Sequence, residues 1–243
     1  EADILDAILN TGTALAMVIM GGIHYYTGQL YPMHAIAKAA HQVGAVVGFD
    51  LAHVVGNVPV ALHDWDIDFA VWCSYKYLNA GPGAVGGVFV HEKWATNVNT
   101  PRLAGWWGND EATRFKMEKG FEAIPTAEGW QLSNAPVLGM AAHWASLELF
   151  DAIGMKKLQA KSEVLTAYLE FILDELSAKY AATCRFEIIT PKEKHRRGAQ
   201  LSILVHGEGK KIFDKISDKG VVADWRDIES CVHPLSFEQI SHL

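Results

Sequence analysis

Short apolar runs alternate with helix-like segments through the first half of this chain, and this alternation limits the folds it can adopt. Four runs have this character, at residues 14–20, 45–49, 69–73 and 85–90. Such runs are typical of strands buried on both faces of a sheet. A helix is predicted from Pro32 to about Gln42, with proline suited to its first turn. Because strands that alternate with helices form crossover units, residues 1–136 are predicted to be α/β with a mostly parallel sheet.

The sequence pattern changes after Pro136. An amphipathic helix is predicted over 137–153, ended by Gly154, and a longer helix over 155–180. Shorter elements are predicted after them: strands at 185–189, 200–205 and 221–225, and a helix at 210–219. Residues 137–243 are therefore predicted to form a long connecting helix followed by a small α+β domain.

The amino-acid composition limits the kinds of molecule that the protein is expected to bind. Half of the residues are apolar and a fifth are charged, which supports a sizeable core and excludes a disordered chain. The 21 basic and 28 acidic residues give a net charge of −7 without a block of like charge, so no nucleic-acid-binding surface is expected. The most apolar early stretch, 13–23, is too short to span a bilayer, so no membrane partner is expected.

The cysteines and the first residue bear on the protein's context. Cys73, Cys184 and Cys231 are scattered and lack the paired spacing of a zinc site or a disulfide framework. They indicate a reducing compartment, and we expect a cytoplasmic protein. The chain opens on Glu1 rather than methionine, already inside a helix-like pattern, and no signal peptide precedes it. We therefore expect a piece of a longer protein.

Polar side chains gather where two predicted strands end. Asp50 follows the run at 45–49, with His53 three residues later, and Tyr75 and Lys76 follow the run at 69–73. Binding sites of open α/β sheets lie at the carboxyl ends of strands. A lysine there can lose its proton and form a Schiff base, and an aspartate on a neighbouring strand suits a pyridinium nitrogen. The pair indicates pyridoxal phosphate. The alternative is that Asp50 caps a turn and Lys76 is solvated.

A glycine motif and a histidine-rich stretch suggest other sites. Gly81, Gly83 and Gly86 spell the dinucleotide fingerprint, but a strand-like segment follows where that fingerprint needs a helix, so a turn between strands is favoured. No HExxH motif occurs, the stretch 63–68 is predicted to be a polar loop that leads into a strand, and His34 and His41 are predicted to be surface or packing groups, so no metal site is predicted. No GxSxG motif supports a hydrolase of the α/β type.

A loop motif of two tryptophans between glycines spans 105–108. Aromatic residues in such a loop are typical of interfaces and ligand pockets, although Trp107 could equally be buried for packing. Asn134 precedes the long helix, where it could cap the helix or donate to a ligand.

With these residues in view, the chain resembles the kynureninases, pyridoxal-phosphate enzymes with the aspartate-aminotransferase type of fold (fold type I, class V). The motifs that carry the resemblance run almost to residue 226: HYYTGQ at 24–29, GFDLAHVVGN at 48–57, HDWDIDFAVWCSYKYLNAGPG at 63–83, HEKW at 91–94, GWWGN at 105–109, TRFKM at 113–117, LSNAP at 132–136, RGAQLSILVHG at 197–207 and GVVADWR at 220–226. The resemblance implies a partial large domain with a mostly parallel sheet, followed by a smaller C-terminal domain.

The resemblance also implies roles for the residues at the strand ends. Lys76 forms the internal aldimine with the cofactor, Asp50 holds its pyridine nitrogen, and His53 lies beside the ring. Tyr75 binds the phosphate and can act in proton transfer. Each of these implied roles agrees with the chemistry expected of that residue type at a strand end.

Two further residues and a reaction follow from the resemblance. Trp106 and Asn134 complete the phosphate site, from the neighbouring subunit of a homodimer with shared active sites. The implied reaction hydrolyses L-kynurenine, or its 3-hydroxy form, to an anthranilate and L-alanine, a step of tryptophan catabolism and NAD biosynthesis.

The chain departs from the family pattern at three places. It lacks the family's upstream part, which carries a phosphate-binding loop, an aromatic that stacks on the ring and an aspartate. Near the end, residues 227–234 replace the context of a carboxylate-clamping arginine, and Gly21 stands where some members have serine. We therefore expect the chain alone to be inactive. The alternatives are a non-catalytic relative, and a related lyase such as a cysteine desulfurase, for which Cys73 is predicted to lie too far inside a strand.

Overall fold

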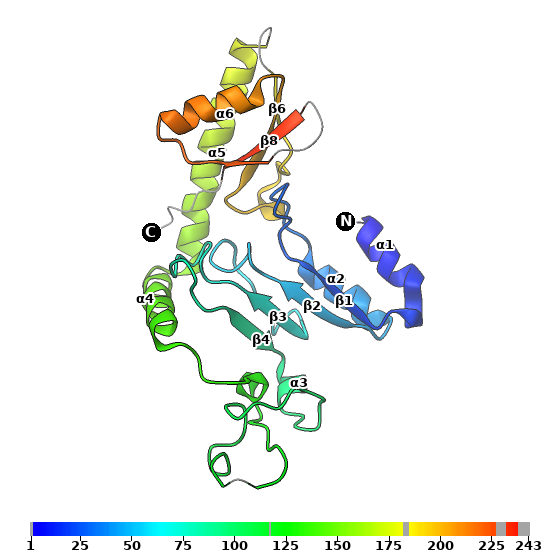
Figure 1. Ribbon diagram of the computed structural model, residues 1–243. Coiled ribbons are helices and arrows are strands. Elements are labelled where there is room, and N and C mark those ends of the chain that lie inside the picture. Colours follow the sequence, from blue (N-terminus) through cyan, green and yellow to red (C-terminus); the bar gives the residue numbers. More distant parts are fainter. Residues whose placement is uncertain (1, 117, 182–184, 227–231, 238–243) are drawn as a thin grey trace. The chain divides into compact units, whose positions relative to one another are not determined.

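The computed structural model describes residues 2–116, 118–181, 185–226 and 232–237 (Figure 1). The chain divides into two compact units. The first contains residues 1–22, 32–55 and 60–148, and the second contains residues 23–31, 56–59 and 149–243. The division predicted after Pro136 stays a prediction. No helix within the described ranges is long and apolar enough to cross a membrane.

A four-stranded sheet forms the centre of the first unit. Its strands are β1 (Met17–Gly21), β2 (Val46–Asp50), β3 (Phe69–Trp72) and β4 (Gly87–Val90), and they lie in that order. The first three strands are parallel, and β4 is antiparallel to β3. The mostly parallel sheet predicted from the alternating pattern is therefore confirmed.

Short helices surround this sheet. They are α1 (Ala2–Thr11), η1 (Gly12–Ala14), α2 (Met33–Gln42), α3 (Glu92–Ala95) and η2 (Ala127–Trp130). Helix α2 ends at Gln42 as predicted but begins one residue later than predicted, at Met33, with Pro32 as its N-cap residue. It ends in a Schellman motif, in which the Ala45 N–H donates to the Ala40 carbonyl at 3.0 Å and Gly44 takes a φ of 81°. This ending turns the chain directly into β2, and α2 lies against β2 (Figure 1).

Burial differs between the strands and between the faces of the sheet. Val47 and Phe49 of β2 are almost fully buried, which confirms the prediction for this strand. The prediction for residues 14–20 is wrong in two respects: the strand starts later, because η1 takes residue 14, and it is not buried, because Ile19 stays 63% exposed. As an edge strand, β1 has a partner on one side only, and Ile19 and Gly48 share the face opposite Val47.

The second unit contains the end of α4 (Val137–Ile153), α5 (Met155–Lys179), α6 (Gly209–Asp218) and the 3-10 turn η3 (Lys194–Arg196). Its antiparallel sheet has the order β5 (Phe186–Ile188), β6 (Leu201–His206), β8 (Val232–Phe237) and β7 (Asp224–Trp225). Ile203 and Val205 of β6 form a buried core with apolar side chains of α5, α6 and β5. The predicted helices and strands are found, although β7 is shorter than predicted and β8 was not predicted.

The ends of α4 match the prediction, but its amphipathic character does not. Large apolar side chains lie around the helix, and Val137, Leu138 and Trp144 are at least two-thirds exposed. The regular spacing of polar residues in the sequence therefore does not mark a buried face in the described chain.

Candidate functional site

The predicted strand-end residues of the first unit come together. Asp50 is the last residue of β2, and its backbone pairs with Val71 of the neighbouring parallel strand β3. Lys76 follows the end of β3 by four residues. The Asp50 carboxylate accepts a hydrogen bond from the Ala52 N–H at 2.8 Å while the residue stays exposed. The carboxylate thus shapes the turn and still presents charge at the strand end.

A direct contact joins the two turns. Lys76 Nζ lies 3.0 Å from His53 Nε2, which is within hydrogen-bonding distance. His53 also has an edge-on contact with the buried ring of Tyr77, at 6.3 Å between ring centres. The amine is only partly exposed. The alternative of a freely solvated lysine is therefore wrong, because this amine is tied to a residue 23 positions earlier in the chain.

The turn that carries Lys76 is fixed by its own backbone. The Ala80 N–H donates to the Ser74 carbonyl at 3.0 Å, and the Asn79 N–H donates to the Lys76 carbonyl at the same distance. Asn79 adopts a positive φ of 55°, a conformation that asparagine tolerates better than most residues. The Ser74 hydroxyl donates to the carbonyl of Val85. These contacts hold the lysine backbone in one place.

Tyr75 lies exposed beside this group, with Lys76 Nζ 6.0 Å from its ring centre. The pKa of the Tyr75 hydroxyl is raised, chiefly by its side-chain interactions with Cys73, then by burial and by the negative charge of Asp50. A phenol is protonated at neutral pH at its ordinary pKa of 10.0, and a raised pKa leaves it a hydrogen-bond donor there. Cys73, predicted inside a strand, lies just after β3 and its thiol faces the Ala52 carbonyl at 3.8 Å.

The glycine-rich segment forms the return from β3 to β4. Gly81 and Gly83 have positive φ angles of 86° and 72°. A side chain on Gly86 would lie 2.7 Å from the Trp72 carbonyl oxygen. Because β4 follows this segment and no helix opens from it, the dinucleotide reading of the three glycines is excluded, as the sequence context indicated.

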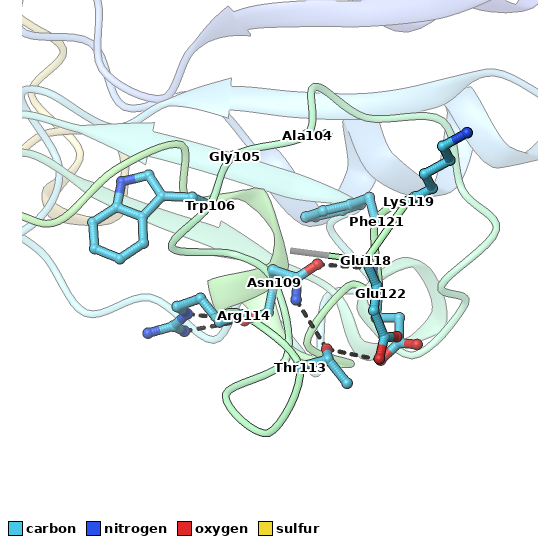
Figure 2. A pocket seen from close by; sticks show the side chains of 11 residues that line it. Ala104, Gly105, Trp106, Asn109, Thr113, Arg114, Glu118, Lys119, Phe121 and Glu122 are labelled. Carbon is cyan, nitrogen blue, oxygen red and sulfur yellow. Dashed lines mark hydrogen bonds between the residues drawn. The ribbon is translucent and has the colours of Figure 1, made fainter. Parts of the chain in front are cut away.

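The tryptophan loop forms a separate part of the first unit. Gly105 and Gly108 have no room for a side chain, because a Cβ at Gly105 would lie 2.2 Å from Leu132 Cα and one at Gly108 would lie 2.9 Å from the Gln131 carbonyl. Between them, Trp106 is 47% exposed and lines a cavity of about 320 Å³ (Figure 2). Trp107 is partly buried, so the packing alternative describes it in part.

Asn134 is exposed and accepts a hydrogen bond from the Ser133 hydroxyl at 3.2 Å. Trp106 has ring contacts with Trp107, Phe115 and Arg114, all from its own loop. Four of the six predicted site residues therefore form one group at the ends of β2 and β3. The contacts of Trp106 and Asn134 lie in their own segments instead.

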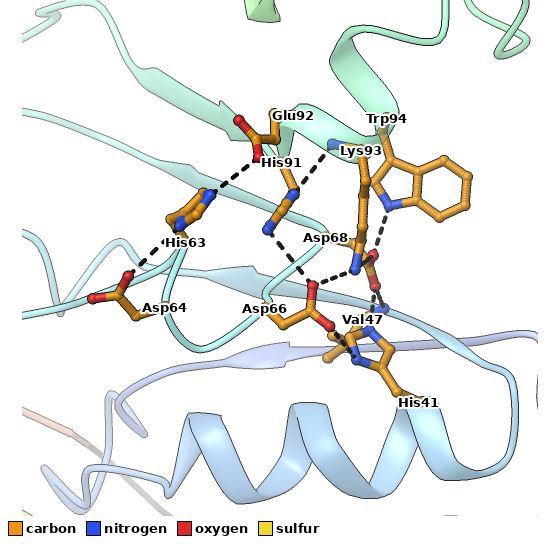
Figure 3. Close-up of polar contacts among 10 residues, drawn as sticks. All are labelled: His41, Val47, His63, Asp64, Asp66, Asp68, His91, Glu92, Lys93 and Trp94. Carbon is orange, nitrogen blue, oxygen red and sulfur yellow. Dashed lines mark hydrogen bonds and ion pairs between the residues drawn. The ribbon is translucent and has the colours of Figure 1, made fainter.

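A polar network that sequence reasoning missed lies where β2 and β3 begin, at the ends opposite the candidate site (Figure 3). Asp68, only 1% exposed, accepts from Val47 N–H at 2.7 Å, Trp94 Nε1 at 2.6 Å and Lys93 Nζ at 2.7 Å. His41 Nε2 adds a fourth contact at 2.9 Å. The prediction of an ordinary polar loop at 63–68 is therefore wrong for Asp68, which the chain buries as a hub.

The same contacts determine the charge of Asp68. Burial alone would raise the pKa of this carboxyl, but its hydrogen bonds to Lys93, His41, Trp94 and Val47 outweigh burial and lower the pKa. His41 faces a second carboxylate, Asp66, at 3.2 Å from Nδ1. The prediction that His41 is a surface or packing group is thus wrong. In the described part of the chain, no three His, Cys, Asp or Glu side chains are arranged to hold a metal ion.

Comparison with known proteins identifies a family and relatives that match most of the chain in sequence. Residues 1–222 match the family Aminotransferase class-V. The kynureninase of Flavobacterium psychrophilum is 51% identical over 225 residues, 93% of this chain and 52% of that protein. The kynureninase of Myxococcus xanthus is 53% identical over 224 residues, 92% of this chain and 51% of that protein. The resemblance to the kynureninases is therefore confirmed, and the chain spans about half the length of the curated relatives it matches.

Solved structures show the same fold at low sequence identity. The cysteine desulfurase of Thermococcus onnurineus aligns with a TM-score of 0.74 at 15% identity, covering 98% of this chain and 57% of that one. A variant of the cystine C-S lyase C-DES, with glycine linked covalently to its PLP cofactor, aligns with a TM-score of 0.75 at 18% identity, covering 96% of this chain and 58% of that one. These neighbours confirm the predicted fold-type-I α/β class and carry no argument about the reaction.

Proposed function

The chain belongs to the aminotransferase class-V family, and on this premise we propose that it carries the cofactor-binding and catalytic residues of a kynureninase. The proposed reaction is hydrolysis of L-kynurenine, or its 3-hydroxy form, to an anthranilate and L-alanine, with pyridoxal phosphate as cofactor. One observation carries the proposal. The Lys76 amine, held by His53 after β3, lies at the same sheet edge as the Asp50 carboxylate that ends β2.

The side chains present fit pyridoxal phosphate. An amine can hold its aldehyde carbon, a carboxylate can pair with its protonated ring nitrogen, and a phenol and an indole N–H can donate to its phosphate. Lys76, Asp50, Tyr75 and Trp106 supply these groups, and His53 would lie beside the ring. Asn134 would add an amide donor at the phosphate. Each group has the charge or hydrogen-bonding capacity that its proposed partner needs.

When bound, the cofactor supplies the electron sink for cleavage of the substrate Cβ–Cγ bond. The Lys76 amine would hold the aldehyde carbon of the cofactor in the resting protein and would take the proton from the substrate α-carbon during the reaction. The His53 imidazole lies within hydrogen-bonding distance of that amine and would keep it at the strand end. Asp50 keeps the ring nitrogen charged, and the protonated Tyr75 can donate to the phosphate or to a reacting oxygen. Water adds to the γ-ketone of the substrate before the bond breaks.

We further propose a cytoplasmic homodimer with shared active sites. Trp106 is half exposed, and its contacts come from its own loop, which supports a role at the cofactor of a second subunit. Aromatic residues with an N–H suit an interface that is apolar at one end and polar at the other. The sequence residues 227–231, where the family's clamping arginine would be sought, lie outside the described residues.

A reconstitution experiment tests the proposed function. The whole protein is mixed with pyridoxal phosphate, and the visible band of a lysine-bound cofactor is followed before and after borohydride reduction. The band, its covalent trapping and the release of anthranilate from kynurenine are all expected to depend on Lys76, so Lys76→Ala should lack them. Cofactor binding without turnover of kynurenine would favour the non-catalytic alternative. Release of sulfur from cysteine would favour a desulfurase. Of the three cysteines that such a reaction could use, Cys184 and Cys231 lie outside the described residues.

A further inference from the structure

We propose that Arg114 is a positioning residue that holds Trp106 ready for the cofactor phosphate. This inference rests on the proposed function, because it takes Trp106 as a phosphate ligand. Arg114 does not itself need to touch the cofactor. The sequence motif that contains it, residues 113–117, has no role in the proposed reaction.

The guanidinium of Arg114 donates to backbone carbonyls on both sides of Gly108, and Figure 2 shows its bonds to Asn109. Its Nη2 donates to the Trp107 carbonyl at 2.8 Å and to the Asn109 carbonyl at 3.1 Å, and its Nε donates to Asn109 at 3.3 Å. The same planar group stacks over Trp107, 4.5 Å from the ring centre, and lies 5.9 Å from the ring centre of Trp106. Only arginine offers several donors in a flat fork together with a face that stacks on an aromatic ring.

A second set of contacts closes the loop from the other side. The Asn109 side chain accepts from the Glu122 N–H at 2.9 Å and donates to Thr113 Oγ1 at 3.0 Å. The Thr113 hydroxyl donates to the Glu122 carboxylate at 2.9 Å. Backbone bonds from Asp110 N–H to the Glu122 carbonyl and from Ile124 N–H to the Gly108 carbonyl join the same two segments. Arg114 connects this set of contacts to Trp107, the residue directly after Trp106.

Trp106 itself depends on these contacts for its position. Its indole is nearly half exposed, so burial does not fix it. Its ring neighbours are Trp107, edge-on at 5.0 Å between ring centres, and Phe115 at 6.1 Å. Trp107 is also the residue over which Arg114 stacks. Removing the guanidinium therefore frees both the backbone and the ring that orient the Trp106 indole, and ordering it on binding becomes more costly.

The test compares two ligands that differ only in the phosphate. Pyridoxal phosphate and pyridoxal are titrated into the whole protein, and the dissociation constant of each is taken from the lysine-dependent visible band. Arg114→Gln removes the charge and the fork, and Arg114→Lys keeps the charge alone. Both variants are expected to bind pyridoxal phosphate about three- to tenfold more weakly and to bind pyridoxal normally. A matched control is Arg102→Gln, because Arg102 also donates to loop carbonyls, but stacks on Trp130.

Non-additivity gives the second readout. In a Trp106→Phe background, which lacks the indole N–H, Arg114→Gln should cause little further loss of phosphate-dependent affinity, because both changes remove one interaction. An equal loss for both ligands, or additive losses in the double variant, would overturn the inference, and unchanged affinity in Arg114→Lys and Arg114→Gln would do the same. If the unsubstituted protein shows no Lys76-dependent band, the proposed function itself fails. If the band is normal but the Arg114 variants bind pyridoxal phosphate and pyridoxal with the same relative affinity as the unsubstituted protein, only the inference about Arg114 fails.

Discussion

Replacing Asp68 with asparagine tests whether the buried network holds the strands that carry the site. The two carboxylate oxygens accept four hydrogen bonds, two of them from the Val47 and Trp94 N–H groups. An asparagine offers one acceptor oxygen, so its NH₂ must face two donors. Lys93 can turn to solvent, since its side chain is 35% exposed, and His41 can change tautomer, but a buried N–H of Val47 or Trp94 loses its partner in either orientation of the amide.

The expected loss of stability follows from these contacts. An unsatisfied buried donor costs about 1–3 kcal/mol, and the partly exposed ion pair with Lys93 adds about 1 kcal/mol or less. Asp68→Asn should therefore lower the free energy of unfolding by about 2–4 kcal/mol at neutral pH, measured by urea denaturation with an unchanged m-value. Since Val47 lies in β2 and Asp68 directly precedes β3, the substitution should also weaken cofactor binding at the ends of those strands.

The pH dependence gives this prediction a second measurement. The pKa of Asp68 is lowered in the folded chain from its ordinary value of 3.8. A carboxyl with a depressed pKa contributes its stability above the unfolded pKa and loses it as the pH falls through the folded value. The gap between the natural chain and Asp68→Asn should thus be full above about pH 5 and shrink below pH 4. The control Asp64→Asn changes an exposed carboxylate 3.6 Å from His63 and should cost under about 0.5 kcal/mol. Equal losses in the two variants, or a gap that persists in acid, would refute the reasoning.

Three further changes probe the site and its loop. Asp50→Asn should abolish most kynurenine turnover while leaving urea stability nearly unchanged, because a neutral amide cannot hold a protonated ring nitrogen and the Asp50 side chain is exposed; equal turnover would mark a turn residue only. In the whole protein, Trp106→Ala mixed with Lys76→Ala should recover part of the activity, because half of the mixed sites hold both intact residues; no recovery in demonstrated heterodimers would exclude shared sites. Gly105→Ala should destabilise the loop by about 1–3 kcal/mol, seen as faster amide exchange near Leu132, because its Cβ would lie 2.2 Å from that backbone; unchanged exchange would show that the loop can shift without cost.

The sheet could be predicted from sequence because the signals for β2 and α2 are local. Apolar β-branched residues at 46–47 and the helix stop at Gly44 agree with the packing that the structure adopts. The burial of β1 could not be predicted in the same way. An apolar run indicates that a strand is suited to burial, but it does not indicate which other segment of the chain covers it. Strand β8 was missed for a different reason. Its sequence contains Pro234, which argues against a strand that has neighbours on both sides.

The residues of the candidate site also differ in whether the sequence alone could reveal them. Lys76 and Asp50 could be placed together because parallel strands bring their carboxyl ends to one sheet edge whatever the side chains are. Asp68 lies in a stretch that looks like an ordinary acidic loop, and its donors come from α2, β2 and α3, so no spacing within that stretch signals their meeting. The position of Asp68 directly before a strand, followed later by Lys93 and Trp94, was the available signal. The reactive residues Lys76 and Asp50 were therefore easier to find than Asp68, the buried residue that joins their strands. A reaction requires particular residue types, which the sequence shows directly, whereas the burial of a side chain depends on the whole fold.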